Sequence, residues 1–226
     1  MQNNSLAVFS PTALTSEVRA LVTSLGAQPR YLVCPDFEHH IFLSEWARAF
    51  PDARVLGPEG LPEKREAVAD TKGIKFSHVY TAKNRREMSV DADFDKEFDV
   101  EYVASHGNKE LVFCHRPSRT LIQADLVFNL PATEQFSRDK EDATSGLATK
   151  FFSTLTNTKG TAIWQQRFIW YAVAKDKKDF AASVQRIDGW DWDAMMLCHG
   201  DVIETGAKGV FRKVMGWYLE GQSKRV

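Results

Sequence analysis

Several short apolar runs in this chain of 226 residues end in acidic residues or histidines, and this pattern constrains the fold most strongly. The run Tyr31–Val33, for example, leads directly into the stretch Cys34-Pro35-Asp36-Phe37-Glu38-His39-His40. Short apolar runs bounded by turn signals predict buried strands. The polar groups that follow four such runs are Asp36, Glu38, His39, His106, Asp125 and His199. Because the ends of strands are a favoured place for chemistry in layered α/β folds, we expect these groups to form a site.

Helical patterns alternate with the predicted strands. The apolar residues between positions 18 and 25 recur at helical spacing, with Thr15 or Ser16 as the N-cap and Gly26 just past the end. The highly charged stretch from Thr81 to Asp99 predicts a solvated hairpin or sheet edge. We find no internal repeat, low-complexity tract or linker, so we expect one domain over residues 1–226.

The composition argues against several classes of partner. A net charge of −1 gives no electrostatic reason to bind nucleic acid or an anionic membrane surface. The apolar runs are too short to span a bilayer. Three cysteines are an odd and sparse set, typical of a reduced intracellular protein with free thiols. We therefore expect a cytoplasmic protein that acts on a small molecule and binds neither nucleic acid nor membrane, and the sequence leaves its oligomeric state open.

The polar groups at the predicted strand ends are of types that bind transition metals. Imidazole and carboxylate suit zinc, iron or manganese, and a bridging carboxylate can hold two ions close enough to share one water. The residues alone thus indicate a metal-dependent hydrolytic site. Each group also has a simpler reading, as a capped strand-end histidine, a turn residue or an exposed loop carboxylate.

The order of these motifs resembles the metallo-β-lactamase fold superfamily. Its first motif, His-x-His-x-Asp-His at a strand end, corresponds here to Cys34-x-Asp36-x-Glu38-His39. Its later histidines and bridging aspartate correspond to His106 in Ser105-His106-Gly107, Asp125 in Ala124-Asp125-Leu126, and His199 in Cys198-His199-Gly200-Asp201. The resemblance covers roughly residues 30–205 and is strongest to a partly fungal branch with an altered first metal motif.

The resemblance implies a fold and a reaction. The fold is an α/β, αββα sandwich of two mixed sheets with outer helices. The function is a metal-dependent hydrolase of a small ester, thioester, lactone or lactam. A metal-bound hydroxide would be the nucleophile, and Glu38 or Asp125 would orient the water and pass a proton to the leaving group.

The same resemblance assigns the metal ligands. His39, Asp125 and His199, with Glu38, would form one site, and Cys34, Asp36 and His106 the other. Zinc is the expected metal, as one or two ions, with iron, manganese or no metal as alternatives. His40 could replace His39 or support it from behind, and Cys34 also reads as a buried strand-end thiol.

Two other functions remain open from the sequence. The first is a non-catalytic or ligand-binding member of the same fold, because the first motif has lost two histidines. The second is another metal-dependent reaction, such as that of a lyase, an isomerase or an iron-dependent redox enzyme.

Overall fold

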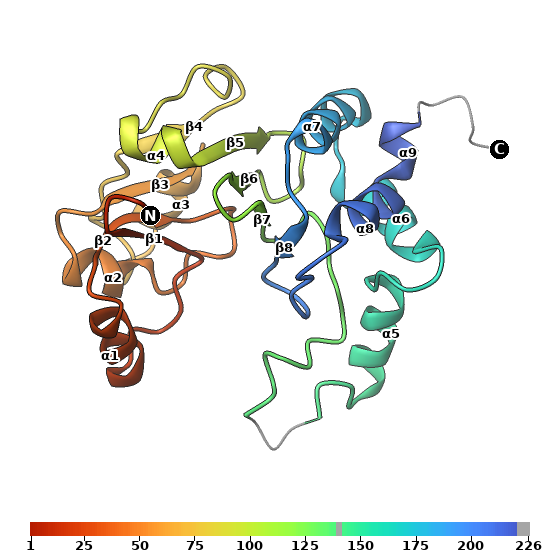
Figure 1. Cartoon of the computed structure of the whole chain (residues 1–226), viewed down its shortest axis with the longest axis horizontal. Coiled ribbons are helices and arrows are strands. Elements are labelled where there is room, and N and C mark those ends of the chain that lie inside the picture. Colours follow the sequence, from red (N-terminus) through yellow and green to blue (C-terminus); the bar gives the residue numbers. More distant parts are fainter. Residues whose placement is uncertain (139–141, 221–226) are drawn as a thin grey trace. The chain divides into compact units, whose positions relative to one another are not determined.

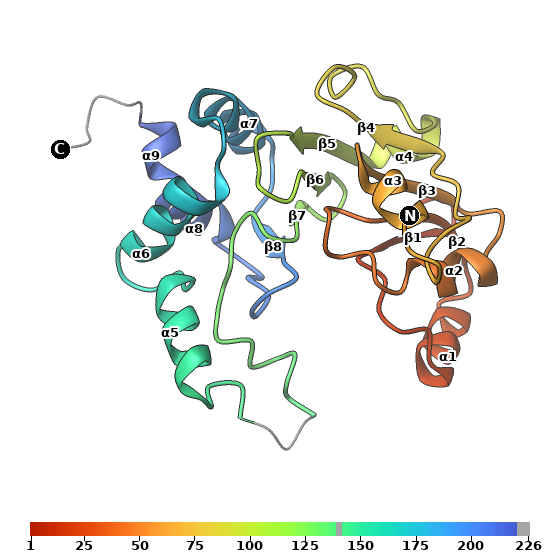
Figure 2. The same cartoon turned by 180° about the vertical axis from the view of Figure 1, so that it is seen from behind.

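The computed structural model describes residues 1–138 and 142–220. The chain divides into two compact units, Met1–Glu97 and Phe98–Val226, and each contains one four-stranded sheet. Figure 1 labels the elements of both units, and Figure 2 shows them from behind. The division falls at the start of the second sheet, so each unit has a sheet and an apolar core of its own. The single domain predicted over the whole chain stays a prediction.

The first unit is built around a sheet with strand order β1-β2-β3-β4, in which every neighbouring pair is parallel. The predicted sheet was mixed, and this one is not, because each connection between its successive strands carries a helix. Parallel neighbours need such a crossover. Its elements are β1 (Ser5–Phe9), α1 (Ser16–Ser24), β2 (Gln28–Val33), α2 (Leu43–Ala49), β3 (Arg54–Pro58), α3 (Leu61–Glu66), β4 (His78–Tyr80) and α4 (Ala92–Glu97).

The start of α1 follows the sequence prediction closely. The Oγ1 atom of Thr15 accepts a hydrogen bond from the Val18 backbone N–H at 3.3 Å, which makes Thr15 the N-cap. Gly26 follows the helix with a φ of +67°, a left-handed conformation that glycine adopts without strain. Local chemistry therefore sets both ends of this helix.

The stretch from Thr81 to Asp99 corrects a prediction. It contains helix α4 in place of the solvated hairpin or edge that its charge indicated. Oδ1 of Asp91 accepts hydrogen bonds from the backbone N–H groups of Asp93 and Phe94, both at 3.0 Å, which is the geometry of a helix cap. The Phe94 ring is fully buried, so one apolar residue anchors an otherwise charged helix.

The second unit contains a mixed sheet with strand order β5-β6-β7-β8, as predicted. The first two pairs are antiparallel and β7 pairs with β8 in parallel. Helices α5 and α6 lie side by side in Figures 1 and 2. The elements are β5 (Phe98–Val103), β6 (Glu110–His115), β7 (Thr120–Ile122), α5 (Leu147–Leu155), α6 (Ile163–Phe168), the π-helical turn η1 (Ile169–Val173), α7 (Lys177–Gly189), β8 (Ala194–Met196), α8 (Ala207–Val214) and α9 (Gly216–Leu219).

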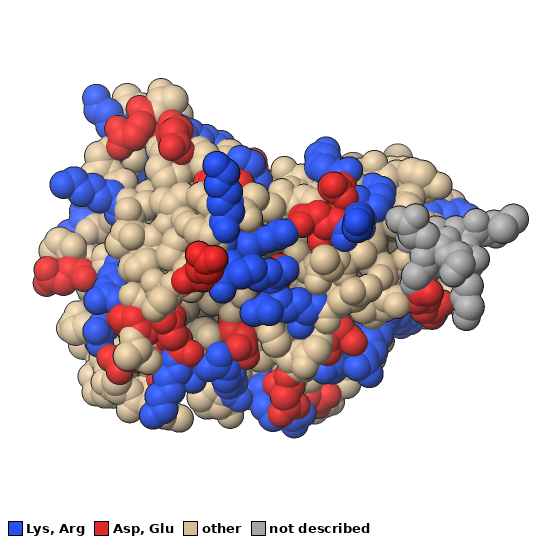
Figure 3. Space-filling view, turned by 90° about the horizontal axis from the view of Figure 1, so that it is seen from above, with Lys and Arg blue, Asp and Glu red and all other residues tan. Residues whose placement is uncertain are grey.

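On the face that Figure 3 draws, both basic and acidic side chains lie at the surface, and several Lys and Arg side chains gather near the centre of the view. Within residues 1–138 and 142–220, no helix combines the length and the apolar character that crossing a bilayer requires.

Candidate metal centre

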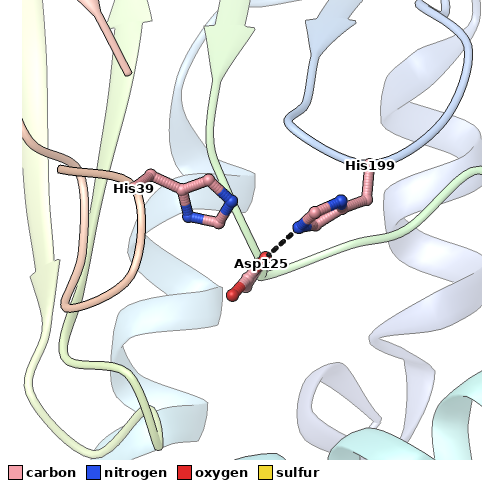
Figure 4. A group of neighbouring side chains, drawn as sticks. All are labelled: His39, Asp125 and His199. Carbon is pink, nitrogen blue, oxygen red and sulfur yellow. Dashed lines mark ion pairs between the residues drawn. The ribbon is translucent and has the colours of Figure 1, made fainter. Parts of the chain in front are cut away.

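Asp125 and His199 lie at one edge of the second sheet. Ile122, the last residue of β7, is in register with Met196, the last residue of β8. Asp125 and His199 each lie three positions beyond these strand ends, and parallel strands bring their carboxyl ends to the same edge. Nε2 of His199 is 3.3 Å from Oδ1 of Asp125, and Figure 4 marks this contact with a dashed line. The parallel pairing of two short strands therefore places a carboxylate beside an imidazole.

The turn that carries Asp125 is folded by a buried glutamine. Strand β7 ends at Ile122, three residues before Asp125. The Oε1 atom of Gln123 accepts from the backbone N–H groups of Leu126 and Val127, at 2.8 and 3.1 Å. Its Nε2 donates to the Val127 carbonyl at 2.8 Å. These side-chain hydrogen bonds take the place of hydrogen bonds between strands, and the chain turns here.

Two neighbours hold Asp125, one through its backbone and one through its carboxylate. The fully buried Glu110 accepts hydrogen bonds from the backbone N–H groups of Ala124 and Asp125, each at 2.9 Å. Nδ2 of Asn108 donates to Oδ2 of Asp125 at 2.7 Å. Sequence reasoning missed both residues, although Glu110 gave a signal as the acidic first residue of an apolar strand. Asp125 is thus a buried carboxylate with a fixed orientation.

The ring of His199 is placed by its neighbours. It stacks on Phe128, with 5.6 Å between ring centroids and an angle of 11° between planes. The Asn129 backbone N–H donates to the His199 carbonyl at 3.1 Å. Gly200 has a φ of +117°, and a Cβ there would lie 2.3 Å from the Asn129 carbonyl, so only glycine fits. The side chain is 46% exposed, which leaves the ring accessible from solvent.

His106 directs both of its ring nitrogens at groups of the protein. Nδ1 accepts a hydrogen bond from the Asn108 backbone N–H at 3.1 Å, so the ring proton lies on Nε2. Nε2 is 3.4 Å from the Asp125 carbonyl oxygen and 3.6 Å from a carboxylate oxygen of Glu110. The residue is buried. This arrangement makes His106 a support for the Asp125 turn, and its predicted role as a metal ligand stays a prediction.

In the first unit, Asp36 organises the loop after β2. Its Oδ1 accepts from the backbone N–H groups of Glu38 and His39, at 2.8 and 2.7 Å. Its Oδ2 lies 2.8 Å from Nδ1 of His39. Because a carboxylate only accepts, Nδ1 carries the proton and the lone pair of His39 lies on Nε2. Metal-binding histidines are commonly oriented by a carboxylate in this way.

Asp36 and Glu38, both predicted as metal ligands, lie in different surroundings. Asp36 is fully buried behind His39, so its geometry suits orienting a ligand better than binding metal itself. The Glu38 side chain is 61% exposed and forms an ion pair with Lys64 at 3.1 Å. Direct ligation by either carboxylate stays a prediction.

Arg65, on α3, holds the end of the same loop, and sequence reasoning did not single it out. Nη1 donates to the His40 carbonyl oxygen at 2.7 Å and lies 2.8 Å from His40 Nδ1, while Nη2 donates to Ser44 Oγ at 2.6 Å. The pKa of His40 is lowered by burial and by the positive charges of Arg65 and Lys64. His40 is therefore a neutral partner of Arg65, and its predicted role in supporting or replacing His39 stays a prediction.

Cys34 is a buried thiol. Burial raises the pKa of its thiol to about 12, so the thiolate that a metal requires is disfavoured. Its reading as an apolar strand-end residue is the one that this environment favours.

A pocket of about 450 Å³ adjoins Asp125 and His199 within the second unit. Its polar lining includes those two residues, His106 and Asn108. Its apolar lining is Phe128, Phe152, Phe168, Ala172 and Val173, with Gly107 between the polar and apolar groups in neither class.

The sequence matches, over residues 1–190, the protein family described as "Domain of unknown function (DUF4336)". The chain belongs to this family. A search of curated proteins found no match.

Solved structures give the fold. The chain is similar to a metallo-β-lactamase from Pontibacter korlensis, with 11% identity and a TM-score of 0.52 over 95% of this chain and 81% of that one. A metallo-β-lactamase from Hirschia baltica gives 8% identity and a TM-score of 0.52, over 95% and 81% of the two chains. The metal-soaked Flv1 flavodiiron core from Synechocystis sp. gives 13% identity and a TM-score of 0.57, over 98% of this chain and 52% of that one.

These likenesses confirm the predicted fold. The chain has a metallo-β-lactamase-like α/β fold with two sheets and helices. At this level of identity the likeness shows the fold, and the function has to be argued from the site.

Proposed function

We propose that this protein is a metal-dependent hydrolase of a small ester, thioester, lactone or lactam. The observation that carries the proposal is the contact between buried Asp125 and accessible His199, where Asn108 binds the Asp125 carboxylate and Glu110 binds the Asp125 backbone N–H. The names of the similar structures, metallo-β-lactamases and a flavodiiron core, add the expectation of a metal.

The proposed metal ligands are His39, Asp125 and His199. Two imidazoles and one carboxylate are a donor set of catalytic zinc sites. Iron or manganese would also accept these ligands. The Asp36–His39 contact supports the assignment, because it leaves the lone pair of His39 on Nε2. Bound there, a metal would make a water more acidic and polarise the substrate carbonyl.

The chain's own part in the reaction falls to Asp125. The oxygen of water attacks the acyl carbon, and the carboxylate of Asp125 takes up the proton that the water loses. The bond to the leaving oxygen, sulfur or nitrogen then breaks, and Asp125 returns a proton to the leaving group. Glu38 was the other candidate for this role, and its exposure and its ion pair with Lys64 make Asp125 the better choice.

Metal content per chain tests the proposal. We expect near-stoichiometric zinc, manganese or iron in protein purified without chelator, and its loss in His39→Ala and in His199→Ala. His78→Ala and His115→Ala are matched controls, because each removes one imidazole from one of the two units at a position away from the proposed ligands. An acyl-ester screen then compares wild type with Asp125→Asn. Unchanged metal and turnover in the Asp125 and His199 variants would overturn the proposal.

A second candidate is a ligand-binding protein without catalysis. It is supported by the contacts of His106 and Glu38, which reduce the set of ligands available to a second metal ion. A metal-free protein that stays metal-free after zinc, iron or manganese is added would favour this alternative.

A further inference from the structure

The pocket beside Asp125 and His199 has an aromatic wall built from three elements. Phe128, Phe152 and Phe168 meet edge to face in all three pairs, with ring centroids 6.0 to 6.1 Å apart and angles of 77 to 85° between planes. Phe152 belongs to α5 and Phe168 to α6. Edge-to-face contacts hold aromatic rings in defined positions. The wall is therefore an ordered surface for an apolar group.

One ring of this aromatic wall, that of Phe128, also positions the proposed metal ligand His199. Phe128 stacks on His199 and also meets Phe152 and Phe168 edge to face. A group bound against the rings would thus be continuous with a group that contacts His199 and Asp125. The pocket has one end suited to polar atoms and another suited to hydrocarbon.

The lining also lacks a counter-ion for an acidic substrate. Among the described residues that line the pocket, none is Lys or Arg, and the one carboxylate is that of Asp125. A negatively charged group placed between the phenyl rings would lose its hydration without a charge to compensate. The chemistry of the lining favours an uncharged group.

We infer that this pocket takes an uncharged apolar group, a phenyl or medium-length alkyl group, joined to the polar group that meets Asp125 and His199. In terms of the proposed function, on which this part rests, it is the acyl side of the substrate. The volume of about 450 Å³ lies within the range of pockets that enclose small-molecule ligands and exceeds what an acetyl group fills. The substrate class becomes neutral arylacyl or medium-chain acyl compounds.

Binding of inert analogues tests this inference without needing turnover. The probes are acetamide, hexanamide, phenylacetamide and succinamate, titrated into the full-length protein by NMR. Burial contributes about fourfold in affinity per methylene, so hexanamide, with four more methylenes, should bind about 250-fold more tightly than acetamide. Succinamate, which carries a carboxylate, should bind no more tightly than acetamide.

Variants of two residues that line the pocket locate the bound group. Phe152→Ala removes part of the wall and should weaken phenylacetamide about tenfold. Ala172→Phe fills the pocket and should weaken phenylacetamide and hexanamide while leaving acetamide unchanged. Phe151→Ala is the matched control, because Phe151 neighbours Phe152 on α5, is 67% exposed and does not line the pocket. It should bind like wild type.

The outcomes separate this inference from the proposed hydrolase. Equal binding of acetamide and hexanamide, or phenylacetamide binding that neither Phe152→Ala nor Ala172→Phe weakens, would overturn the inference. Chain-length-dependent binding that these variants weaken would support it, even in a protein that hydrolyses none of the matching esters. In that last case the proposed hydrolase function would be overturned, and the inference about the apolar pocket would stand.

Discussion

Asp36 and His39 form one contact between a buried carboxylate and a histidine, and Glu110 and His106 form another. In the first, the carboxylate binds Nδ1 at 2.8 Å and the lone pair of His39 is on Nε2. In the second, Nδ1 already accepts from the Asn108 backbone N–H, and Nε2 faces the carboxylate at 3.6 Å. A carboxylate beside a histidine therefore gives two different tautomers, because the partner of Nδ1 decides which nitrogen carries the lone pair.

The two carboxylates also differ in which backbone N–H groups they accept hydrogen bonds from. Asp36 accepts backbone N–H groups of its own loop, within three residues. Glu110 instead accepts backbone N–H groups of Ala124 and Asp125, on a different strand connection. We infer that Asp36 orients a ligand and that Glu110 holds the second unit's turn together.

Replacement of Glu110 should give the largest effect. Glu110→Ala leaves the backbone donors of Ala124 and Asp125 buried without an acceptor, which costs about 3–5 kcal/mol in the free energy of unfolding. Glu110→Gln keeps one acceptor and should cost less. Urea unfolding followed by circular dichroism measures both, and equal stability of wild type and Glu110→Ala would contradict this role.

Replacement of Asp36 should affect metal more than stability. In Asp36→Asn the remaining oxygen can still accept from the loop, but the amide donates to Nδ1 of His39 and moves the ring proton to Nε2. We expect metal affinity to fall about 10- to 100-fold, measured by competition with a chelator. The matched control is His106→Gln, which should lower the free energy of unfolding by about 1–3 kcal/mol and leave metal per folded chain unchanged. Lost metal affinity in His106→Gln and unchanged metal affinity in Asp36→Asn would contradict the roles assigned to Asp36 and His106.

His40 should give the smallest effect, seen as a dependence of stability on pH. Its pKa in the folded protein is lowered by burial and by Arg65 and Lys64. Between that lowered pKa and the ordinary value near 6.5, the unfolded chain binds a proton that the folded protein does not. Stability should therefore fall as pH falls through this window. Melting temperatures from pH 7.5 to 5.5 should drop less in His40→Gln than in wild type, and parallel curves would contradict the assignment.

The sequence by itself determined the local features of this protein. Thr15 and Gly26 bound α1 as predicted, and the fold class followed from the motif order. The residue types at the strand ends predicted a site that includes Asp125 and His199, and the parallel pairing of β7 and β8 brings these two side chains together. These features depend on nearby residues or on the position of short apolar runs, and both can be read from the chain.

Only the tertiary structure decided the roles of the buried polar groups. The sequence does not distinguish a histidine whose Nδ1 faces Asp36, as in His39, from one whose Nδ1 faces a backbone N–H, as in His106. Helix α4 escaped prediction because one capping aspartate and one buried ring outweighed its charge. Arg65 and Glu110 act on backbone groups far along the chain, through contacts that exist only after packing. Hydrogen-bond direction and burial are set by distant segments, and a sequence pattern does not contain them.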